Sequence, residues 1–202
     1  MSIKRNIWGA IALALLALAG CNKMDEEITK QESNFERYLS NQGAADRDKY
    51  DPETDMSGKT KFYDRIGGVY RWNPKEFNLM IERPTGDSVT VAKGDSLSIY
   101  YHAYVMEGSR PGDLLDTNRK YLINSKFKNL NTELWSTDPL RFKLGDGTLM
   151  PSLEQALPGC VLGDSVIFLL TCDLAYGKKP IGVVPQYSPI MFTIIIDDII
   201  KK

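Results

Sequence analysis

Histidine is almost absent from this sequence, with one residue, His102, among 202. That scarcity excludes a metal site built on several histidines, an acid/base pair of two histidines and a zinc-protease helix. Basic residues are not in excess either, since 25 Lys and Arg stand against 26 Asp and Glu, for a net charge of −1. A protein that binds nucleic acid by neutralising phosphates clusters Lys and Arg on one face. The charge balance therefore argues against a nucleic-acid partner.

Cysteine is scarce as well, and long apolar runs are missing. Three cysteines, Cys21, Cys160 and Cys172, are too few for a framework of several disulfides. Two alternatives stay open for Cys160 and Cys172: a bridge between them, or two buried free thiols. The second is favoured because free cysteine is among the most buried residue types. The apolar run over residues 7–19 is too short to cross a bilayer.

The N-terminal segment has the order of a secretory signal. A positive start at Lys4 and Arg5, the apolar run and the small residues after it predict a signal peptide over residues 1–20. The sequence Leu-Ala-Gly-Cys that ends at Cys21 resembles the lipobox of bacterial lipoproteins. In that family the chain is cut before the cysteine, so the resemblance implies acylation of Cys21 and a lipid membrane as a partner. An ordinary signal peptide followed by a chance cysteine is the alternative.

The residues after Cys21 bear on localisation. The acidic Asp25-Glu26-Glu27 is similar to the surface-export signals of some bacterial lipoproteins. We therefore expect a protein of the cell envelope, lipid-anchored at the outer membrane or the cell surface rather than at the inner membrane.

Residues 21–65 have the composition of a lipid-anchored tether that contains a short helix. Ile28, Phe35 and Leu39 recur at helical spacing and predict a thin apolar stripe that needs a partner surface. Residues 41–59 are rich in charged side chains and poor in aliphatic ones, so they cannot bury enough area to fold alone. We therefore expect a linker there.

From residue 66 the sequence changes to short segments of strand composition separated by turn signals. One short helix interrupts them, because Pro151 stands at a helix start, Leu153 and Leu157 lie one turn apart, and Pro158-Gly159 ends the segment. An antiparallel sheet packed on one short helix predicts an α+β domain over residues 66–202. The expected strands cover residues 69–72, 77–81, 97–101, 140–144, 166–170 and 190–196.

Several short motifs follow one another in this domain. They are Gly94-Asp95, Leu115-Asp116-Thr117-Asn118, Phe142-Lys143-Leu144-Gly145, Leu149-Met150-Pro151-Ser152-Leu153-Glu154, Gly163-Asp164, Leu174-Ala175-Tyr176-Gly177 and Gly182-Val183-Val184-Pro185, with Phe192 in the last strand. In this combination they resemble FKBP-type peptidyl-prolyl cis-trans isomerases over roughly residues 77–200. The resemblance implies an antiparallel sheet wrapped on one short helix.

The implied reaction is rotation about an X–Pro bond in proline-containing polypeptides. Rotation crosses a barrier of ~18–20 kcal/mol because amide resonance is broken, and no bond is made or cleaved. A dry apolar pocket disfavours the polar planar amide more than the twisted state, and one or two fixed donors can hold the carbonyl. No metal and no cofactor are expected, which agrees with the scarcity of histidine.

The resemblance also implies the residues of the site. Tyr176 would donate its hydroxyl to a substrate carbonyl, and Asp116 would orient Tyr101 or contact the ligand, which makes these three the expected catalytic residues. The amide of Met150 would be a second donor, and Leu153 would form the pocket floor. The residues expected to bind substrate are Leu140, Phe142, Leu149, Met150, Leu153, Val183, Val184 and Phe192.

Each of these residues also has a structural interpretation. Tyr176 suits a turn, and Asp116 suits a turn or a helix cap. His102 adjoins Tyr101 on a strand, so it faces the opposite side and is assigned no role. The apolar residues at alternating or helical spacing suit a core: Leu140, Phe142, Leu153 and Phe192.

Two features depart from the family. The family usually has a tryptophan at the position of Leu153 and aromatic residues at those of Leu115 and Leu140, so the flat surface for a proline ring is missing here. The segment over 117–138 is longer than usual and is interpreted as an insertion. Its large apolar side chains, Tyr121, Phe127, Leu130 and Trp135, would pack over the pocket mouth or a partner, or else on the domain's own sheet.

The favoured function is a peptidyl-prolyl cis-trans isomerase that acts on exported proteins at the cell envelope. Two alternatives stay open: an FKBP-like peptide-binding chaperone, and a subunit of an envelope complex with weak or no isomerase activity. Leu153 at the pocket floor, in place of an aromatic residue, is compatible with the chaperone as well as with the isomerase.

Overall fold

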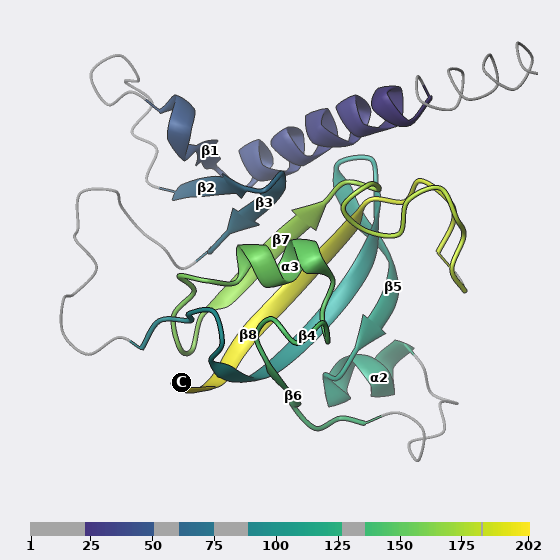
Figure 1. Ribbon diagram of the computed structural model, residues 1–202. Helices are drawn as coiled ribbons and strands as arrows, with labels where there is room; N and C mark the ends of the chain where they lie inside the picture. Colours follow the sequence, from purple (N-terminus) through teal and green to yellow (C-terminus); the bar gives the residue numbers. More distant parts are fainter. Residues whose placement is uncertain (1–22, 51–60, 75–88, 127–135, 183) are drawn as a thin grey trace, which may run out of the picture.

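The computed structural model of the chain describes residues 23–50, 61–74, 89–126, 136–182 and 184–202. The predicted signal peptide, Cys21 and the strand expected over 77–81 lie outside these residues. In the described part of the chain, no helix combines the length and the apolarity needed to cross a membrane. The described residues form one sheet with helices packed on both of its faces (Figure 1).

An eight-stranded sheet organises the described residues, in the order β1-β2-β3-β7-β8-β4-β5, with β6 also paired to β4. The pair β1 and β2 is parallel, and the other pairs are antiparallel, which confirms the predicted α+β class. The strands are β1 (Ala44–Asp46), β2 (Lys61–Ile66), β3 (Val69–Trp72), β4 (Ser96–Glu107), β5 (Arg110–Thr117), β6 (Leu140–Lys143), β7 (Ser165–Leu170) and β8 (Ile190–Ile200). The helical elements are a helix over 23–41, the 3-10 turn η1 (Arg47–Lys49), α2 (Lys120–Lys126) and α3 (Pro151–Ala156).

The side chains of β7 alternate between two buried faces. Val166, Phe168 and Leu170 belong to the core that contains α3, and we call this side of the sheet the inner face. Leu169 points to the opposite side, the outer face, and packs with residues of the N-terminal helix. A strand with both faces covered reads as a continuous apolar run, which is why residues 166–170 were recognisable as a strand.

The helix α3 lies in front of β7 and β8 in Figure 1 and is the short helix that the sequence predicted. Pro151 occupies its first turn, where a missing N–H leaves no bond unmade. Leu153 is 1% exposed against the inner face. At the other end, Arg71 of β3 donates hydrogen bonds to the carbonyl oxygens of Ala156 at 3.2 Å and Pro158 at 2.7 Å. These bonds satisfy acceptors that a helix end leaves open.

The N-terminal helix, purple in Figure 1, packs on the outer face beside β2 and β3. Phe35 and Leu39 are fully buried there, which confirms the predicted stripe and its partner surface. The ring of Phe35 meets the ring of Tyr70 edge to face, with centroids 5.5 Å apart. Because both rings are large, the contact between Phe35 and Tyr70 buries a large apolar area.

The linker expected over residues 41–59 is corrected by the structure. Residues 44–46 form β1, which pairs with the first half of β2, and η1 follows directly. The expected tether over 21–65 therefore contributes two strands to the sheet, and the boundary placed at residue 66 falls on the last residue of β2.

Two of the charged residues that suggested a linker, Arg47 and Lys49, are paired with charges on other elements. Arg47 donates to Asp64 at 2.6 Å, and Asp64 also accepts a hydrogen bond from Arg71 at 3.1 Å. The Lys49 ammonium lies 3.6 Å from a carboxylate oxygen of Glu36 in the N-terminal helix. Composition indicated solvation of these residues, whereas the tertiary structure provides partners.

The predicted insertion over 117–138 begins with the end of β5 and continues into α2. Neither the strand β5 nor the helix α2 was predicted from the sequence. β5 contains Pro111 and Gly112, which weaken strand patterning but are tolerated at the edge of a sheet, where β5 lies. Ile123 anchors α2, at 2% exposed. Phe127, Leu130 and Trp135 lie outside the described residues.

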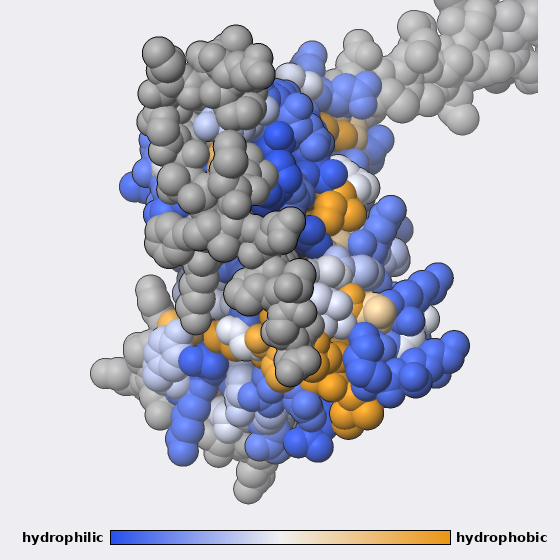
Figure 2. Space-filling view, turned by 90° about the vertical axis from the view of Figure 1, so that its left-hand side faces the viewer, coloured by the Kyte–Doolittle hydropathy of each residue, from blue (hydrophilic) through white to orange (hydrophobic). Residues whose placement is uncertain are grey.

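Cys160 and Cys172 are buried thiols that form no disulfide, which agrees with the favoured of the two alternatives. On the face seen in Figure 2, apolar residues gather in the lower half and hydrophilic ones surround them. Val89, Leu162 and Ile200 are among the large apolar side chains that reach the surface.

Candidate functional site

A cavity of about 320 Å³ lies between the inner face of the sheet and α3. Strands β4, β5, β6 and β8, the helix α3 and the loop between β7 and β8 all contribute to its walls. The lining residues are Ile99, Tyr101, Asp116, Leu140, Thr148, Leu149, Met150, Leu153, Tyr176, Phe192 and Ile194.

The floor of the cavity is aliphatic. Leu153 of α3, Ile99 of β4 and Ile194 of β8 line it and are each 1% exposed. Neighbouring strands place Ile99 opposite Ile196 and Tyr101 opposite Ile194, so their inward side chains form one continuous surface. A group that enters the cavity therefore loses contact with water at its deep end.

Tyr101 and Asp116 form the polar wall. The Tyr101 hydroxyl donates a hydrogen bond to Asp116 Oδ2 at 3.0 Å, and Asp116 Oδ1 accepts one from the Thr117 N–H at 2.7 Å. Burial and the negative charge of Asp116 raise the pKa of Tyr101 well above its ordinary value. The Tyr101 hydroxyl therefore stays protonated at neutral pH and holds the carboxylate in place.

Tyr176 stands at the mouth of the cavity, on the loop between β7 and β8. The loop is tied to α3 by the Ser152 hydroxyl, which donates to the Leu174 carbonyl oxygen at 2.8 Å. Burial raises the pKa of Tyr176, and the charge of Asp116 adds to the effect. Among the described residues, the Tyr176 hydroxyl has no hydrogen-bond partner. It is therefore a protonated donor that a bound molecule can use.

The segment before α3 supplies a backbone donor. Its turn is held by the Asp146 carboxylate, which accepts from the Thr148 N–H at 2.8 Å, and by Glu154, which accepts from the Gly147 N–H at 3.0 Å. Met150 follows at the start of α3, and its N–H bonds to no described residue. A helix start leaves such N–H groups open to an acceptor.

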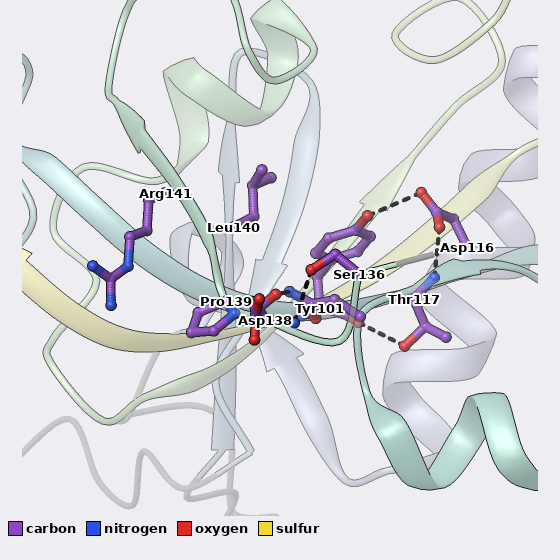
Figure 3. Close-up of a pocket in the computed structure, with 9 residues that line it drawn as sticks. Tyr101, Asp116, Thr117, Ser136, Asp138, Pro139, Leu140 and Arg141 are labelled. Carbon is purple, nitrogen blue, oxygen red and sulfur yellow. Dashed lines mark hydrogen bonds between the residues drawn. The ribbon is translucent and has the colours of Figure 1, made fainter. Parts of the chain in front are cut away.

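A second pocket, of about 360 Å³, adjoins the cavity and shares Tyr101, Asp116 and Leu140 with it (Figure 3). In Figure 3, Tyr101 and Asp116 lean toward each other at one end, and Arg141 points away from them at the other. The buried Asn118 fixes this wall.

The Asn118 side chain links β4 to the segment before β6 through hydrogen bonds. Its Oδ1 accepts from the Tyr101 N–H at 2.7 Å, and its Nδ2 donates to the carbonyl oxygens of Ile99 and Asp138, each at 3.1 Å. A buried amide with its acceptor and donor both satisfied restricts the backbone of Tyr101. Asn118 thus fixes the backbone of the polar wall at Tyr101.

The structure brings together eight of the eleven expected site residues: Tyr101, Asp116, Leu140, Leu149, Met150, Leu153, Tyr176 and Phe192. Phe142 is not among the lining residues; it is buried in the core of the inner face and pairs with Leu97. Val184 is also absent from the lining, but it is buried in a small cluster against which the lining residues Tyr176 and Phe192 pack. Substrate binding by Phe142 and Val184 stays a prediction. Val183 lies outside the described residues.

Three lining residues were missed: Ile99, Thr148 and Ile194. Two of them had a signal in the sequence, since Ile99 and Ile194 stand two positions from Tyr101 and Phe192 on the same strands and therefore share their face. Thr148 had none, because its place depends on the turn before α3.

Asp116 is the charged residue among the described residues that line the cavity, and it is bonded by Tyr101 and Thr117. Among the described residues, no group of three or more His, Cys, Asp or Glu side chains is placed to hold a metal ion. Within the described part of the chain, the cavity has an aliphatic floor, and the Tyr176 hydroxyl and the Met150 N–H beside it have no hydrogen-bond partner. These features define a class of protein: an α+β domain whose sheet wraps a short helix and encloses a small apolar cavity with polar donors at its wall.

Comparison with known proteins then gives the family. The model of the family described as FKBP-type peptidyl-prolyl cis-trans isomerase matches residues 87–197, more than half of the chain. The chain belongs to this family and carries an FKBP-type peptidyl-prolyl cis-trans isomerase domain.

Individual relatives agree with this assignment. FK506-binding protein 2 of Candida glabrata is 28% identical over 93 residues, which is 46% of this chain and 68% of that protein. FK506-binding protein 2 of Yarrowia lipolytica is 25% identical over 134 residues, 63% of this chain and 80% of that protein.

Solved structures share the fold. The crystal structure of FkpA from Escherichia coli superposes with a TM-score of 0.53 at 14% identity, and covers 98% of this chain and 71% of that chain. The three FKBP domains of wheat FKBP73 give a TM-score of 0.50 at 15% identity, over 70% of this chain and 52% of that chain.

Proposed function

We propose that this protein is a peptidyl-prolyl cis-trans isomerase of the cell envelope, held at the outer membrane or the cell surface by acylated Cys21, where it acts on exported proteins. Membership of the family supports the reaction. The signal-like residues 1–20 and the lipobox-like sequence before Cys21 support the location. The observation that carries the chemistry is the aliphatic cavity lined by the Tyr176 hydroxyl, which has no hydrogen-bond partner among the described residues.

The cavity lowers the rotation barrier by treating the two states of the amide differently. A planar X–Pro amide has a large dipole from resonance, and a twisted amide does not. Moving the planar form from water onto Leu153, Ile99 and Ile194 costs solvation that the twisted form loses to a smaller extent. Each ~1.4 kcal/mol of this difference accelerates rotation about tenfold.

Fixed donors orient the substrate while it rotates. The Tyr176 hydroxyl and the Met150 N–H are open to carbonyl oxygens of the peptide, and neither has to break an existing bond to a described residue first. Asp116 is held by Tyr101 and Thr117, so the polar wall is set before substrate arrives. Donors placed in advance cost no reorganisation during the reaction.

A single-atom deletion tests this chemistry. Tyr176→Phe removes the hydroxyl, and kcat/KM for a proline-containing peptide is expected to fall about tenfold, since one hydrogen bond contributes roughly 1 kcal/mol or somewhat more. Tyr121→Phe is the matched control, because Tyr121 is exposed on α2 away from the cavity. An unchanged rate in Tyr176→Phe would contradict the role of the hydroxyl.

A peptide-holding chaperone is the second candidate, and Leu153 favours it. The resemblance leads us to expect an aromatic floor, on which a proline ring stacks, and a leucine gives a softer and rounder surface. Suppression of the aggregation of an unfolded client by a protein without measurable isomerase activity would select this candidate. If neither activity is present, the remaining reading is a structural subunit of an envelope complex.

The anchor has its own test. Cys21→Ser removes the thiol that lipidation requires, so the protein should remain uncleaved or leave the membrane fraction. Unchanged processing together with unchanged membrane fractionation would overturn the proposed anchor. This experiment does not depend on isomerase activity, so the two parts of the proposal can fail separately.

A further inference from the structure

A buried glutamine interrupts the apolar stripe of the N-terminal helix. Gln31 lies seven residues after Met24 and four before Phe35, on the helix face that packs against the rest of the protein, and it is 3% exposed. A polar side chain at such a position costs free energy unless it is fully bonded. Gln31 is bonded through both ends of its amide.

Both bonds of Gln31 go to the loop between β7 and β8. Its Oε1 accepts a hydrogen bond from the Cys172 N–H at 2.8 Å, and its Nε2 donates one to the Tyr187 carbonyl oxygen at 2.8 Å. Cys172 stands near the start of the loop, and Tyr187 near its end. One side chain therefore joins the two ends of the loop that carries Tyr176.

The loop is organised around these two attachment points. The Gly177 N–H donates to the Cys172 carbonyl oxygen at 2.6 Å, and the Tyr187 N–H donates to the Gly177 carbonyl oxygen at 2.9 Å. Gly177, the residue after Tyr176, is thus bonded to both residues that Gln31 holds. A shift of Cys172 or Tyr187 therefore moves Gly177 through one hydrogen bond, and Gly177 is covalently joined to Tyr176.

Two other residues of the same helix contact the same attachment points. The Met24 sulfur lies 3.8 Å from the Cys172 sulfur, and the Lys23 ammonium lies 5.1 Å from the centre of the Tyr187 ring. Tyr187 has a φ of 59°, a left-handed conformation that a tyrosine rarely adopts without support from its surroundings. The first turns of the helix thus hold the loop, and its last turns hold the sheet.

From these contacts we infer that Gln31 is a positioning residue of the active site and that the N-terminal helix is a brace for the Tyr176 loop. The inference rests on the proposed function, because the effect of Gln31 is measured as a change in isomerase activity. Gln31 touches no substrate; it acts by keeping Cys172 and Tyr187 at a fixed separation. Without the brace, the loop spends less time with Tyr176 at the cavity mouth, and kcat/KM falls in proportion to the competent fraction.

The test compares two variants of one helix in the full chain. Gln31→Leu keeps the volume approximately and removes both hydrogen bonds. Phe35→Leu is the matched control, since Phe35 lies one turn further on and packs against Tyr70 of the sheet rather than against the loop. Both variants lower the melting temperature. Activity on a proline-containing peptide is measured well below both melting temperatures, so that each protein is folded.

The expected result is a loss of about tenfold in kcat/KM for Gln31→Leu and a change of less than about twofold for Phe35→Leu. Amide hydrogen exchange at Gly177 and Tyr187 should accelerate in the first variant and keep the rate of the wild type in the second. Equal effects of the two variants on kcat/KM and on exchange would overturn the inference and leave Gln31 a purely structural residue.

A conservative variant gives a further signature. In Gln31→Glu the side chain still accepts from Cys172, but an ionised carboxylate faces the Tyr187 carbonyl oxygen, and a protonated one donates to it. Activity relative to the wild type should therefore recover as the pH falls through the pKa of this buried carboxyl. A ratio that is independent of pH would count against the bond to Tyr187.

Failure of the inference and failure of the proposed function give different results. A wild-type protein without isomerase activity would contradict the proposed function. In that case hydrogen exchange decides about the brace: faster exchange at Gly177 and Tyr187 in Gln31→Leu alone supports it, and equal exchange in both variants overturns it.

Discussion

The two faces of the sheet are packed in different ways. On the inner face the buried side chains are mostly aliphatic, among them Leu153, Leu170 and Ile194, and they leave a cavity. On the outer face, where the N-terminal helix packs, aromatic rings are more frequent, among them Phe35 and Tyr70. The inner face contains the candidate site, whereas the helix on the outer face also contacts the loop of that site through Gln31.

Buried polar atoms sharpen this contrast. Within the described residues, the Tyr70 hydroxyl and the Trp72 indole N–H are buried on the outer face without a hydrogen-bond partner. Among the described residues, no fully buried side-chain nitrogen or oxygen of the inner face lacks a partner, and the Tyr101 and Asp116 pair is an example of a bonded one. The Tyr176 hydroxyl and the Met150 N–H, which have no partner among the described residues, belong instead to the lining of the cavity. Satisfied buried polar groups fix the wall of the site.

The largest expected effect tests whether the outer face belongs to the same cooperative unit. Phe35→Ala should lower the free energy of unfolding by about 4 kcal/mol, because a fully buried ring is replaced by a methyl group and a cavity. Urea denaturation followed by tryptophan fluorescence measures this. A loss below about 1 kcal/mol would mean that the N-terminal helix is an independent appendage, and the comparison of two faces of one fold would fail.

The matching change on the inner face is Leu153→Ala, with an expected loss of about 3 kcal/mol in the free energy of unfolding. Unlike Phe35→Ala, it should also weaken the binding of a proline-containing peptide, since it enlarges the floor of the cavity. Isothermal titration at a temperature where the variant is folded gives the affinity. Equal peptide affinities in wild type and Leu153→Ala would mean that Leu153 does not contribute to peptide binding.

A smaller effect, of opposite sign, is expected for Tyr70→Phe. The variant removes a buried hydroxyl that has no partner in the described structure and leaves the ring contacts with Phe35 in place. The free energy of unfolding should stay the same or rise by up to about 1 kcal/mol. A loss above about 1 kcal/mol would show that the hydroxyl is bonded and that the contrast in polar satisfaction is wrong.

The smallest effect concerns His102, which lies on the outer side of β4 beside Tyr104. Burial, with a contribution from the charge of Arg119, lowers the pKa of His102 below its ordinary value of 6.5. Because the unfolded chain binds a proton more readily, stability from this group is complete above pH 6.5 and is lost as the pH falls from 6.5 through the lower folded pKa.

The measurement compares the pH dependence of unfolding in the wild type and in His102→Phe. The variant should lose the part of the decline that begins just below pH 6.5, where no other side chain of this protein has its ordinary pKa. Identical slopes in the two proteins would mean that His102 is as solvated in the folded chain as in the unfolded one.

The lining of the candidate site was largely predictable because its residues follow local rules. Leu140, Leu153 and Phe192 lie at strand or helix spacing, and a motif of the sequence contains Tyr176. Phe142 shares a strand face with Leu140, but that face does not say where the cavity ends along it, and Phe142 is not in the lining. Val184 is a loop residue, and its place in the cluster next to Tyr176 and Phe192 depends on the fold of the loop.

The N-terminal region was not predictable to the same extent. Its helical stripe was correct, but the strands at 44–46 and 61–66 were hidden by charged side chains whose partners, such as Asp64 for Arg47, could not be seen in composition. Gln31 is buried on the same helix face, but a polar residue does not match an apolar period, so the period did not reveal its burial.

By itself the sequence determined the regularly patterned elements of the isomerase domain, such as β7 and α3, because the periods of strand and helix are local properties of the chain. It did not determine β5 or α2. The tertiary structure decided where the cavity ends, which strands extend the sheet and what holds the Tyr176 loop. Gln31 is separated from its partners Cys172 and Tyr187 by 141 and 156 residues. No local period connects positions so far apart, so only the packed fold brings them together.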